Sequence, residues 1–433
     1  MSTTIPTKPA PGDVARESLW HNSDFLKFWF GESVSLFGAQ VAILALPLTA
    51  ILALDASDEQ VGLLRFAQLV PYLCLSMLFG VWVDRVRRRN VMLWTNSVRV
   101  VLIGLVPLLY ALDALSVPLL LVLACVIGIV SVLFDLSWMS YVPILVKDSK
   151  HYVEASSRMG ISQSTAEVAG PGLAGVLVGW LTAPVALAIN SVGYLVSIVS
   201  LLLIRAREPR PAAAGAQNHF LRDLRDGVAW VVRDPILRWL AFIGFCCNFS
   251  TNTIWTMFLL HVTHDLHLAS SVIGFIFGTA SMGGLVGAVI SRRVIRRFPL
   301  GRVYLVAQSA LLLGPLLIVA AAGPTPVMVG MFVLSFFTTY LGLGVAGVVV
   351  VSLRQTTTPH SLMARMTGAF RTLLFGGGAL GGLAAGFLSS SLGPMTALTV
   401  AAIASAAVVF GLIISPVSRL RELPPAVQEP VPA

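Results

Sequence analysis

Long apolar segments recur along the whole chain and are separated by short polar connections. We place twelve of them, at 25–53, 60–83, 91–112, 116–142, 155–180, 184–204, 236–261, 271–291, 303–322, 326–350, 364–388 and 394–415. A helix of about 20 apolar residues crosses a bilayer core of about 30 Å. Backbone groups inside lipid must satisfy their own hydrogen bonds, and the segments lack the period-2 alternation of barrel strands. The pattern predicts an all-α polytopic membrane protein with twelve transmembrane helices.

Composition strengthens this prediction. Of the 433 residues, 56% are hydrophobic and 11% are charged, and the mean hydropathy is +0.85. A water-soluble domain of this size has no use for so much apolar surface. The sequence contains no Walker loop or other Gly-rich phosphate cradle, so we expect no direct use of ATP. All four cysteines lie in apolar segments, which argues against a disulfide framework or a zinc site.

The positive charges predict how the chain is oriented in the membrane. All but two of the 29 Lys and Arg residues lie in the termini, in every second connection, or at the helix ends beside them. The exceptions are Arg65 and Arg99. Since Lys and Arg mark cytoplasmic loops, we expect both termini in the cytoplasm and the protein in the cell membrane. The net charge of +9 therefore reflects topology, and we expect no nucleic-acid partner.

A sequence motif that occurs twice divides the chain into two halves. "GVWVDRVRRRN" begins at residue 80 and "GAVISRRVIRRF" begins at residue 287, each after the second apolar segment of its half. The longest hydrophilic connection lies between them, and its apolar residues are spaced for one helix face among arginines. We predict a cytoplasmic leader (1–18), a six-helix bundle (19–204), a linker with an amphipathic helix on the inner leaflet (205–235), a second six-helix bundle (236–416) and a cytoplasmic tail (417–433). Two pseudo-symmetric six-helix bundles are a transporter layout.

The first of these stretches resembles the signature loop of the major facilitator superfamily, G-x-x-x-D-R-x-x-R-R. The matching positions are Gly80, Asp84, Arg85, Arg88 and Arg89, although the usual pattern has a glycine where this chain has an arginine at 87. "NSDFLKFWFGESVSLFG", "FDLSWMSYVPILV", "AEVAGPGLAG" and "SLRQTTTPHSLMARMTGAFR" are most similar to the drug/proton antiporter branch with macrolide-efflux-type and siderophore exporters. The resemblance covers nearly the whole chain and implies the major facilitator fold.

The resemblance assigns roles to two of these stretches. It implies that Asp84 holds the two halves together on the inner side, with its own arginines and the N-terminus of helix eleven as partners. The alternative for the arginines is that they only set topology. Gly170, Pro171 and Gly175 resemble an antiporter motif, in which glycines permit close helix contact and the proline kinks the helix. Ordinary packing of small residues is the alternative there.

Five ionisable residues lie within the predicted bilayer, where burial of charge is costly and usually functional. They are Glu32, Arg99, Asp135, Glu167 and Arg371. Arg99 and Asp135 lie at similar depths on neighbouring helices, so we expect them to pair, either as a fixed ion pair or as part of gating. Glu32 lies at a similar level on helix one, which the resemblance places at the cavity. Glu32 and Glu167 lack an obvious cationic partner, which favours proton coupling or cation binding. We therefore expect Glu32 to be the coupling acid, with Glu167 as the next candidate.

The resemblance also implies that helices one, four, seven and ten line a central cavity. Our candidates for substrate contact on these helices are Gln40, Trp138, Asn248, Asn252, Trp255, Phe336, Thr338 and Thr339. Such a mixture of aromatic and polar side chains suits a mid-sized amphipathic molecule. For any single hydroxyl the alternative is a bond to the carbonyl of the preceding turn.

These patterns predict a transporter and not an enzyme. We expect secondary active export of a hydrophobic or amphipathic small molecule, such as a drug, antibiotic or siderophore-like compound, by proton antiport with alternating access. An importer or a lipid-moving member of the superfamily is the alternative, and a membrane-embedded enzyme or receptor is a further one. We interpret His261, His264, Asp265 and His267 as solvated residues at a helix end. We expect a monomer without metal or cofactor, whose partners are the substrate, protons and the lipid bilayer.

Overall fold

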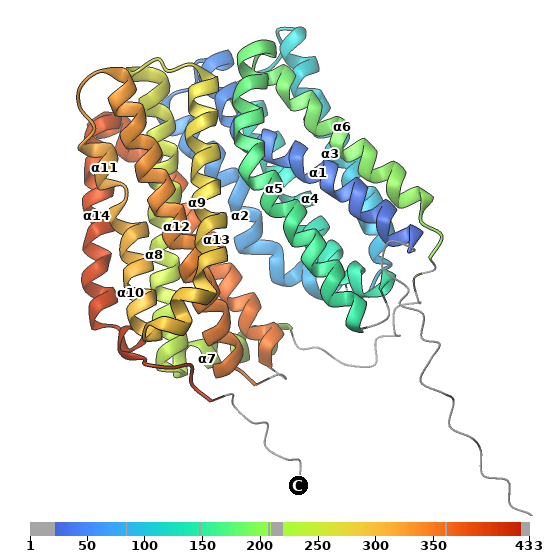
Figure 1. Cartoon of the computed structure of the whole chain (residues 1–433). Helices are drawn as coiled ribbons and strands as arrows, with labels where there is room; N and C mark the ends of the chain where they lie inside the picture. Colours follow the sequence, from blue (N-terminus) through green and yellow to red (C-terminus); the bar gives the residue numbers. More distant parts are fainter. Residues whose placement is uncertain are drawn as a thin grey trace, which may run out of the picture.

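The computed structural model describes residues 22–83, 85–146, 149–206, 208, 220–359 and 362–425, and this part of the chain contains helices but no strand. Six long helices form the first half: α1 (Ser23–Leu48, extended by a wider turn over Thr49–Ala53), α2 (Asp58–Val83), α3 (Arg88–Ala111), α4 (Val117–Leu145), α5 (Ser149–Leu181) and α6 (Ala183–Leu203). The second half lies beside it (Figure 1). The leader 1–18 and the tail beyond residue 425 lie outside the described residues.

The second half repeats the layout of the first. After α7 (Phe220–Arg233) it contains α8 (Pro235–Leu260, extended by a wider turn over His261–Asp265), α9 (Ser270–Arg297), α10 (Leu300–Leu313) with the short α11 (Leu316–Val319), α12 (Thr325–Thr357), α13 (Met363–Leu392) and α14 (Pro394–Ile414), followed by a 3₁₀ turn over Pro416–Arg419. The repeat extends to backbone detail. Thr182 precedes α6 with φ of 82° and Gly393 precedes α14 with φ of 80°, so equivalent turns use the same conformation, although threonine is strained there.

The twelve predicted segments coincide with these long helices, and the all-α fold is confirmed. Among the described residues, nine helices are long and apolar enough to cross a membrane by length and composition. The long helices that fall short are α2, α5 and α8, and each carries polar side chains that line a cavity between or within the halves. The segment predicted at 303–322 is interrupted between α10 and α11, where Gly314 and Pro315 interrupt the helix. Proline lacks the backbone N–H that would continue it.

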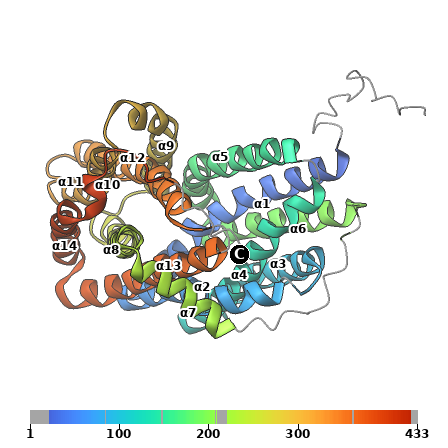
Figure 2. The same cartoon turned by 90° about the horizontal axis from the view of Figure 1, so that it is seen from below.

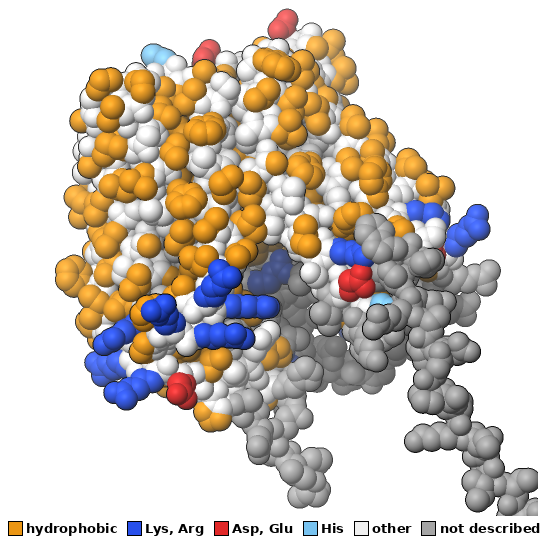
Figure 3. Space-filling view, in the orientation of Figure 1, with side chains coloured by type: hydrophobic (Ala, Val, Ile, Leu, Met, Phe, Trp, Pro, Cys, Tyr) orange, Lys and Arg blue, Asp and Glu red, His pale blue; other side chains and the backbone are white. Residues whose placement is uncertain are grey.

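Charge distinguishes the two ends of the bundle. We call the end with the α2–α3, α4–α5, α9–α10 and α12–α13 connections the basic end, and the opposite one the acidic end. Figure 3 shows Lys and Arg side chains along the lower edge of one face, whereas the charged side chains at its upper edge are acids. Apolar side chains cover the band between them, as expected for a multi-pass membrane protein.

The hydrophobic core is shared at one end and divided at the other. One buried cluster combines residues of both halves, such as Val41 and Leu64 of the first with Phe258 and Ala385 of the second. Towards the basic end, the cluster around Tyr304 contains only residues of the second half, and the cluster around Tyr141 only residues of the first. The two halves are therefore packed together at the acidic end and separate at the basic end.

Glycines allow the halves to approach closely at the acidic end, where α2 packs on α13 and α5 packs on α9 (Figure 2). A Cβ atom placed on Gly62 would lie 2.6 Å from the Cα of Gly386, and one on Gly175 would lie 2.8 Å from the Cα of Gly274. A side chain at either contact would force the helices apart. We call these two contacts the acidic-end seal.

Polar side chains join the halves beside this seal. Asp58 at the start of α2 accepts a hydrogen bond from Ser389 of α13, and it lies 3.4 Å from the ring of His264 (Nδ1 to Oδ1). Ser390 donates to Glu59 over 2.9 Å. The seal therefore has a polar cover on its outer side.

The helices diverge towards the basic end. Close contacts between α2 and α13 run from Gly62 with Gly386 to Leu73 with Gly376, whereas a Cβ atom placed on Gly80, nearer the basic end of α2, would meet no atom of the described second half within 4 Å. Figure 3 shows the surface hollowed between the two halves near this end. The structure is therefore closed at the acidic end and open towards the basic end.

The linker forms a helix over 220–233, where the sequence predicts one. This helix, α7, packs on α13 at the basic end: a Cβ atom on Gly227 would lie 2.6 Å from the carbonyl oxygen of Arg365, and Arg365 pairs with Asp226 over 3.2 Å. Val231 is buried in the core of the second half. Contact of α7 with the inner leaflet stays a prediction.

The seal predicts that a side chain at Gly175 opens the acidic end. We expect Gly175→Val to shift the distance between spin labels on Ser57→Cys and Ala269→Cys to longer values, measured by electron–electron resonance in a background without native cysteines. The matched control is Gly179→Val on the same helix, because a Cβ there meets no other described atom within 4 Å. Equal distance distributions in the two variants would remove Gly175 from the seal.

Candidate functional site

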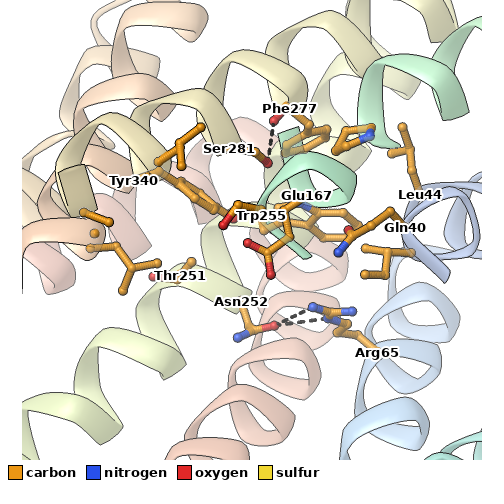
Figure 4. A pocket seen from close by; sticks show the side chains of 18 residues that line it. Gln40, Leu44, Arg65, Glu167, Thr251, Asn252, Trp255, Phe277, Ser281 and Tyr340 are labelled. Carbon is orange, nitrogen blue, oxygen red and sulfur yellow. Dashed lines mark hydrogen bonds between the residues drawn. The ribbon is translucent and has the colours of Figure 1, made fainter. Parts of the chain in front are cut away.

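A central cavity of about 510 Å³ lies between the halves, on the basic side of the seal. Its walls come from six helices, three of each half. The lining residues are Gln40, Ile43 and Leu44 of α1, Arg65 of α2, Ser164, Glu167 and Pro171 of α5, Thr251, Asn252 and Trp255 of α8, Phe277, Ser281, Gly284, Leu285 and Ala288 of α9, and Tyr340, Leu343 and Gly344 of α12. Figure 4 shows aromatic rings, amides and two charged side chains facing the same space. This wall offers an aromatic surface together with a few polar contacts.

Arg65 crosses this cavity from the first half to the second. Its Nε and Nη2 donate to Oδ1 of Asn252 over 3.1 and 2.9 Å, and its Nη1 donates to Gln68 over 3.2 Å. The guanidinium also lies 5.1 Å from the ring centre of Trp255. Hydrogen bonds to this partly buried charge and contact with an aromatic face both stabilise the cation. Arg65 is therefore a link between the halves at the cavity wall.

The sequence signal for Arg65 was its place on the wrong side of the charge pattern. Arg65 and Arg99 are the two basic residues away from the predicted cytoplasmic side, and the sequence predicts only Arg99 to lie within the bilayer. Arg65 lies seven residues into α2, about 10 Å along the helix at about 1.5 Å per residue. This depth places its charge inside the protein instead of at the membrane surface.

Glu167 is the acid of the central cavity. Its carboxylate accepts a hydrogen bond from Gln163, one turn earlier on α5, over 2.9 Å. In Figure 4 it points into the space beside Trp255 and Asn252. The cavity thus holds one carboxylate and one guanidinium, which are not joined by an ion pair among the described residues.

A second cavity of about 390 Å³ lies mainly within the first half. We call it the acid cavity, because Glu32 of α1 and Asp135 of α4 both line it, together with Arg99 of α3. The sequence placed these residues at a similar depth, and the structure brings them to one space. Arg65 and Ile43 line both cavities, so the acid cavity and the central cavity share a wall.

Glu32 is buried, with an exposed fraction of 2%. It accepts a hydrogen bond from the hydroxyl of Ser197 over 2.6 Å, and that hydroxyl accepts one from Asn96 over 2.9 Å. Asn96 in turn accepts from Arg99 over 3.5 Å. A chain of hydrogen bonds therefore connects the Glu32 carboxyl to the Arg99 guanidinium, although the sequence showed no cation near Glu32.

The predicted pairing of Asp135 with Arg99 is wrong in this conformation. No ion pair within 4.0 Å joins them among the described residues; Asp135 accepts a hydrogen bond from the hydroxyl of Tyr72 over 2.8 Å. Arg99 lies over the rings of Phe134 and Tyr194, at 4.4 and 5.1 Å from their centres. Depth along two helices could not reveal this, because it fixes the level of a side chain and not the direction in which it points.

Tyr72 connects the acid cavity to the second half. Its ring stacks on Phe375 of α13, with ring centres 4.5 Å apart, while its hydroxyl bonds Asp135. Arg371, the remaining intramembrane candidate, lies one turn away on α13, with its guanidinium 5.7 Å from the Phe375 ring. Tyr72 therefore joins Asp135 to a contact between the halves.

The signature loop is only partly described. Asp84, to which the resemblance gave a gating role, lies outside the described residues. Within the described part, Glu208 lies at the N-terminus of α3. Its carboxylate accepts from the backbone N–H of Arg88 (2.8 Å) and of Arg89 (3.1 Å), and pairs with the Arg88 guanidinium at 3.7 Å. A carboxylate is stabilised there by the unsatisfied N–H groups of the first turn. Arg85 is exposed.

The glycine motif of α5 lies in two helix contacts. A Cβ atom on Gly170 would lie 2.3 Å from the Cβ of Gln40 on α1, and Gly175 forms the seal with Gly274. Pro171 lines the central cavity between them. The motif therefore packs α5 on both halves at once.

The candidates for substrate contact divide into two groups. Gln40, Asn252 and Trp255 line the central cavity, whereas Trp138, Asn248, Phe336, Thr338 and Thr339 line neither of the two cavities. Phe336 packs in the core against the rings of Phe258 and Phe277, with ring centres 4.8 and 5.1 Å away. The sequence placed these residues on cavity helices but could not give their face, and Tyr340, a neighbour of the chosen threonines, is the residue that faces the cavity.

The other predicted polar contacts of α12 and α8 are local. Thr338 donates to the carbonyl of Leu334 one turn earlier, and Asn248 donates to Gly244 in the same way. Thr339 is buried and faces Gly314. Trp138 packs against the core of the first half. The alternative stated for single hydroxyls, a bond to the preceding turn, describes Thr338.

The histidines after α8 have separate partners. His261 pairs with Asp265 over 2.7 Å, His264 faces Asp58 across the halves, and His267 lies 3.1 Å from the Thr263 carbonyl. Among the described residues, no group of three or more His, Cys, Asp or Glu side chains is arranged to hold a metal ion.

Comparison with known proteins settles the family. Residues 28–382 match the profile of one family, the Major Facilitator Superfamily. The chain belongs to this superfamily. The resemblance found in the sequence is thereby confirmed, and the protein is a transporter and not an enzyme.

Among curated members of the superfamily, the chain is similar to two exporters. It is 23% identical over 401 residues to the multidrug efflux pump Tap of Mycolicibacterium fortuitum, which covers 89% of this chain and 93% of Tap. It is 23% identical over 261 residues to the enterobactin exporter EntS of Citrobacter koseri, covering 60% of each chain.

Solved structures of other transporters share the fold. The nucleoside transporter NupG superposes with a TM-score of 0.74 at 13% identity, covering 91% of this chain and 99% of that one. A bacterial homologue of the iron transporter ferroportin gives a TM-score of 0.66 at 18% identity, covering 92% and 99%. At this identity the likeness concerns the fold alone.

The link made by Arg65 predicts a loss of stability when its acceptor is removed. Asn252→Leu removes the amide oxygen that accepts two N–H bonds from the partly buried Arg65 guanidinium, and we expect the free energy of unfolding to fall by about 2–3 kcal/mol. Thermal unfolding of purified protein in detergent measures this. Asn248→Leu is the control, because Asn248 donates only to its own helix; an equal loss in both variants would show that Arg65 does not depend on Asn252.

Proposed function

We propose that this transporter exports a hydrophobic or amphipathic small molecule in exchange for protons. The observation that carries the proposal is the shared wall of the two cavities. Glu32 and Asp135 line one cavity, Trp255 and Asn252 line the other, and Arg65 lines both. A proton bound in the first cavity and a substrate bound in the second therefore act on the same side chain.

The chemistry of the acid cavity supports a proton-binding role. Burial in a low dielectric disfavours the charged form of a carboxyl group, so that such a group can take up and release a proton near neutral pH. Glu32 is bound by Ser197 and is connected to Arg99 only through hydrogen bonds, not by a direct ion pair. Its protonation is therefore free to change without breaking a salt bridge.

Alternating access supplies the transport cycle. In the state described here the central cavity is open towards the basic end, where substrate enters and the proton leaves. Parting of the acidic-end seal would then expose substrate to the other side and admit a proton to Glu32 or Asp135. A ligand shifts such an equilibrium only through different affinities for the two states. In this proposal Arg65 supplies such a difference, because parting of the halves would separate it from Asn252, with which it is bonded in the state described here.

The lining of the central cavity supports an amphipathic substrate. The rings of Trp255, Phe277 and Tyr340 offer apolar surface, and Gln40, Glu167 and Asn252 offer polar contacts. Ligand pockets with mostly apolar walls and a few placed polar groups orient drug-sized molecules. The multidrug and enterobactin exporters among its relatives favour export over uptake. The charge pattern supports the cell membrane and a cytoplasmic basic end with both termini. We further propose that the protein acts as a monomer.

Removal of the Glu32 carboxylate tests the proposal. We expect Glu32→Gln to abolish efflux driven by a pH gradient in proteoliposomes and to leave substrate binding measurable, because the side chain lies in the acid cavity and not in the central one. A panel of drugs and siderophores, with and without an uncoupler, identifies the substrate for this assay. Glu154→Gln, at an ion pair with Arg158 outside both cavities, is the matched control. Uphill transport by Glu32→Gln would exclude Glu32 as the coupling acid and make Glu167 the next candidate.

A further inference from the structure

Five arginines from three separate segments converge at the basic end of the second half. Arg296 and Arg297 end α9, Arg302 lies in the first turn of α10, and Arg419 and Arg421 follow α14; together they line a groove of about 630 Å³. We call it the basic groove. More than a hundred residues of chain separate α10 from the last two arginines, so the fold and not the sequence brings them together.

Backbone contacts fix the segment after α14 in this place. The N–H of Leu300 donates to the carbonyl of Arg421 over 3.1 Å, and that of Gly301 donates to the carbonyl of Leu420 over 2.7 Å. A Cβ atom on Gly301 would lie 2.3 Å from the Ser418 carbonyl oxygen. Glycine at 301 therefore permits the close approach that holds Arg419 and Arg421 beside the start of α10.

The positive charge of the groove is not neutralised within the described part of the chain. None of the five arginines has an acidic partner within 4.0 Å there, although Glu422 also lines the groove. Other arginines at the same end are matched, since Arg365 pairs with Asp226 and Arg158 with Glu154. Membrane orientation depends only on how many basic residues lie on the cytoplasmic side, and not on whether they are grouped. Their convergence on one groove therefore needs a further reason, because like charges held together repel.

The groove borders the membrane-facing surface. Phe298 lies in its wall and is 53% exposed, and Ile413 and Ile414 at the end of α14 are 53% and 65% exposed. An anion placed among the arginines would thus have apolar surface directly beside it. Guanidinium groups bind phosphate oxygens through paired hydrogen bonds.

We propose that the basic groove binds the phosphate headgroup of an anionic phospholipid, whose acyl chains lie along the exposed apolar side chains beside α14. A free phosphate ion shares the headgroup chemistry but makes no use of Phe298, Ile413 or Ile414. Basic pockets between helices at the cytoplasmic side are suited to such headgroups. This site is separate from both cavities and does not depend on the transport reaction proposed above.

Native mass spectrometry of the full chain tests the proposal directly. Protein is transferred from nanodiscs of phosphatidylcholine containing phosphatidylglycerol, and the retained phosphatidylglycerol molecules are counted per protein. We expect Arg297→Gln/Arg302→Gln to weaken retention by about tenfold or more, since each arginine near an anionic surface contributes about 1 kcal/mol. Arg292→Gln/Arg293→Gln is the matched control, because it removes the same charge from α9 outside the groove and should retain lipid as the wild type does.

Two further measurements test whether the geometry of the groove matters and whether the bound phosphate group belongs to a lipid or to a free ion. Gly301→Val keeps all five arginines but displaces the segment that carries two of them, so it should also lose the lipid; size-exclusion chromatography confirms that each variant is folded. Inorganic phosphate added at the same concentration should neither displace phosphatidylglycerol nor raise the unfolding temperature. Equal loss in both double variants would show diffuse attraction without a site, and full retention in Arg297→Gln/Arg302→Gln would overturn the proposal. Competition by phosphate alone would make the groove a free-anion site and contradict the lipid assignment.

Discussion

The close contact of the two halves at the acidic end is the constraint on which the rest of this structure depends. Two glycine pairs, Gly62 with Gly386 and Gly175 with Gly274, let helices of opposite halves approach with backbone almost in contact. Around them one hydrophobic core combines residues of both halves, whereas the cores near the basic end belong to one half each. Because apolar lipid provides no hydrophobic drive between membrane helices, such small-residue contacts supply much of the association. The glycine pairs themselves are in van der Waals contact, so separating them breaks no ion pair.

Arg65 adds a charged hydrogen-bonded contact between the halves to the glycine contacts of the seal. Its guanidinium reaches from α2 to Asn252 and Trp255 of the other half, and it lines the cavity with Glu167 as well as the cavity with Glu32. A buried cation is stable only while its acceptors are in place. When the halves part, Arg65 loses these contacts, so that a substrate group or a repositioned carboxylate must take their place. Tyr72 adds a second connection of this kind, since it joins Asp135 to a ring of the second half.

The sequence predicted the helices and their two-fold repeat because membrane helices are specified by length, hydropathy and charge, which are properties of the chain itself. It also placed Glu32 and Asp135 at one depth, and the structure brings them to one cavity. The sequence did not predict the direction in which side chains point. Arg99 and Asp135 share a level but point to different partners, and Phe336 lies on a cavity helix but faces the core. Rotation of a helix about its axis depends on the packing of its neighbours, and an apolar membrane helix carries a weak amphipathic signal from which to read it.

The direction of access to the central cavity is the property that tests this account most directly. Ser164 lines that cavity, so a single cysteine at this position, in a chain without its native cysteines, reports which end is open. The measurement is the rate of reaction with an impermeant thiol reagent, applied from one side and then the other of vesicles of known orientation. The account predicts faster reaction from the basic end in the absence of substrate. Faster reaction from the acidic end, or equal rates from both, would contradict it.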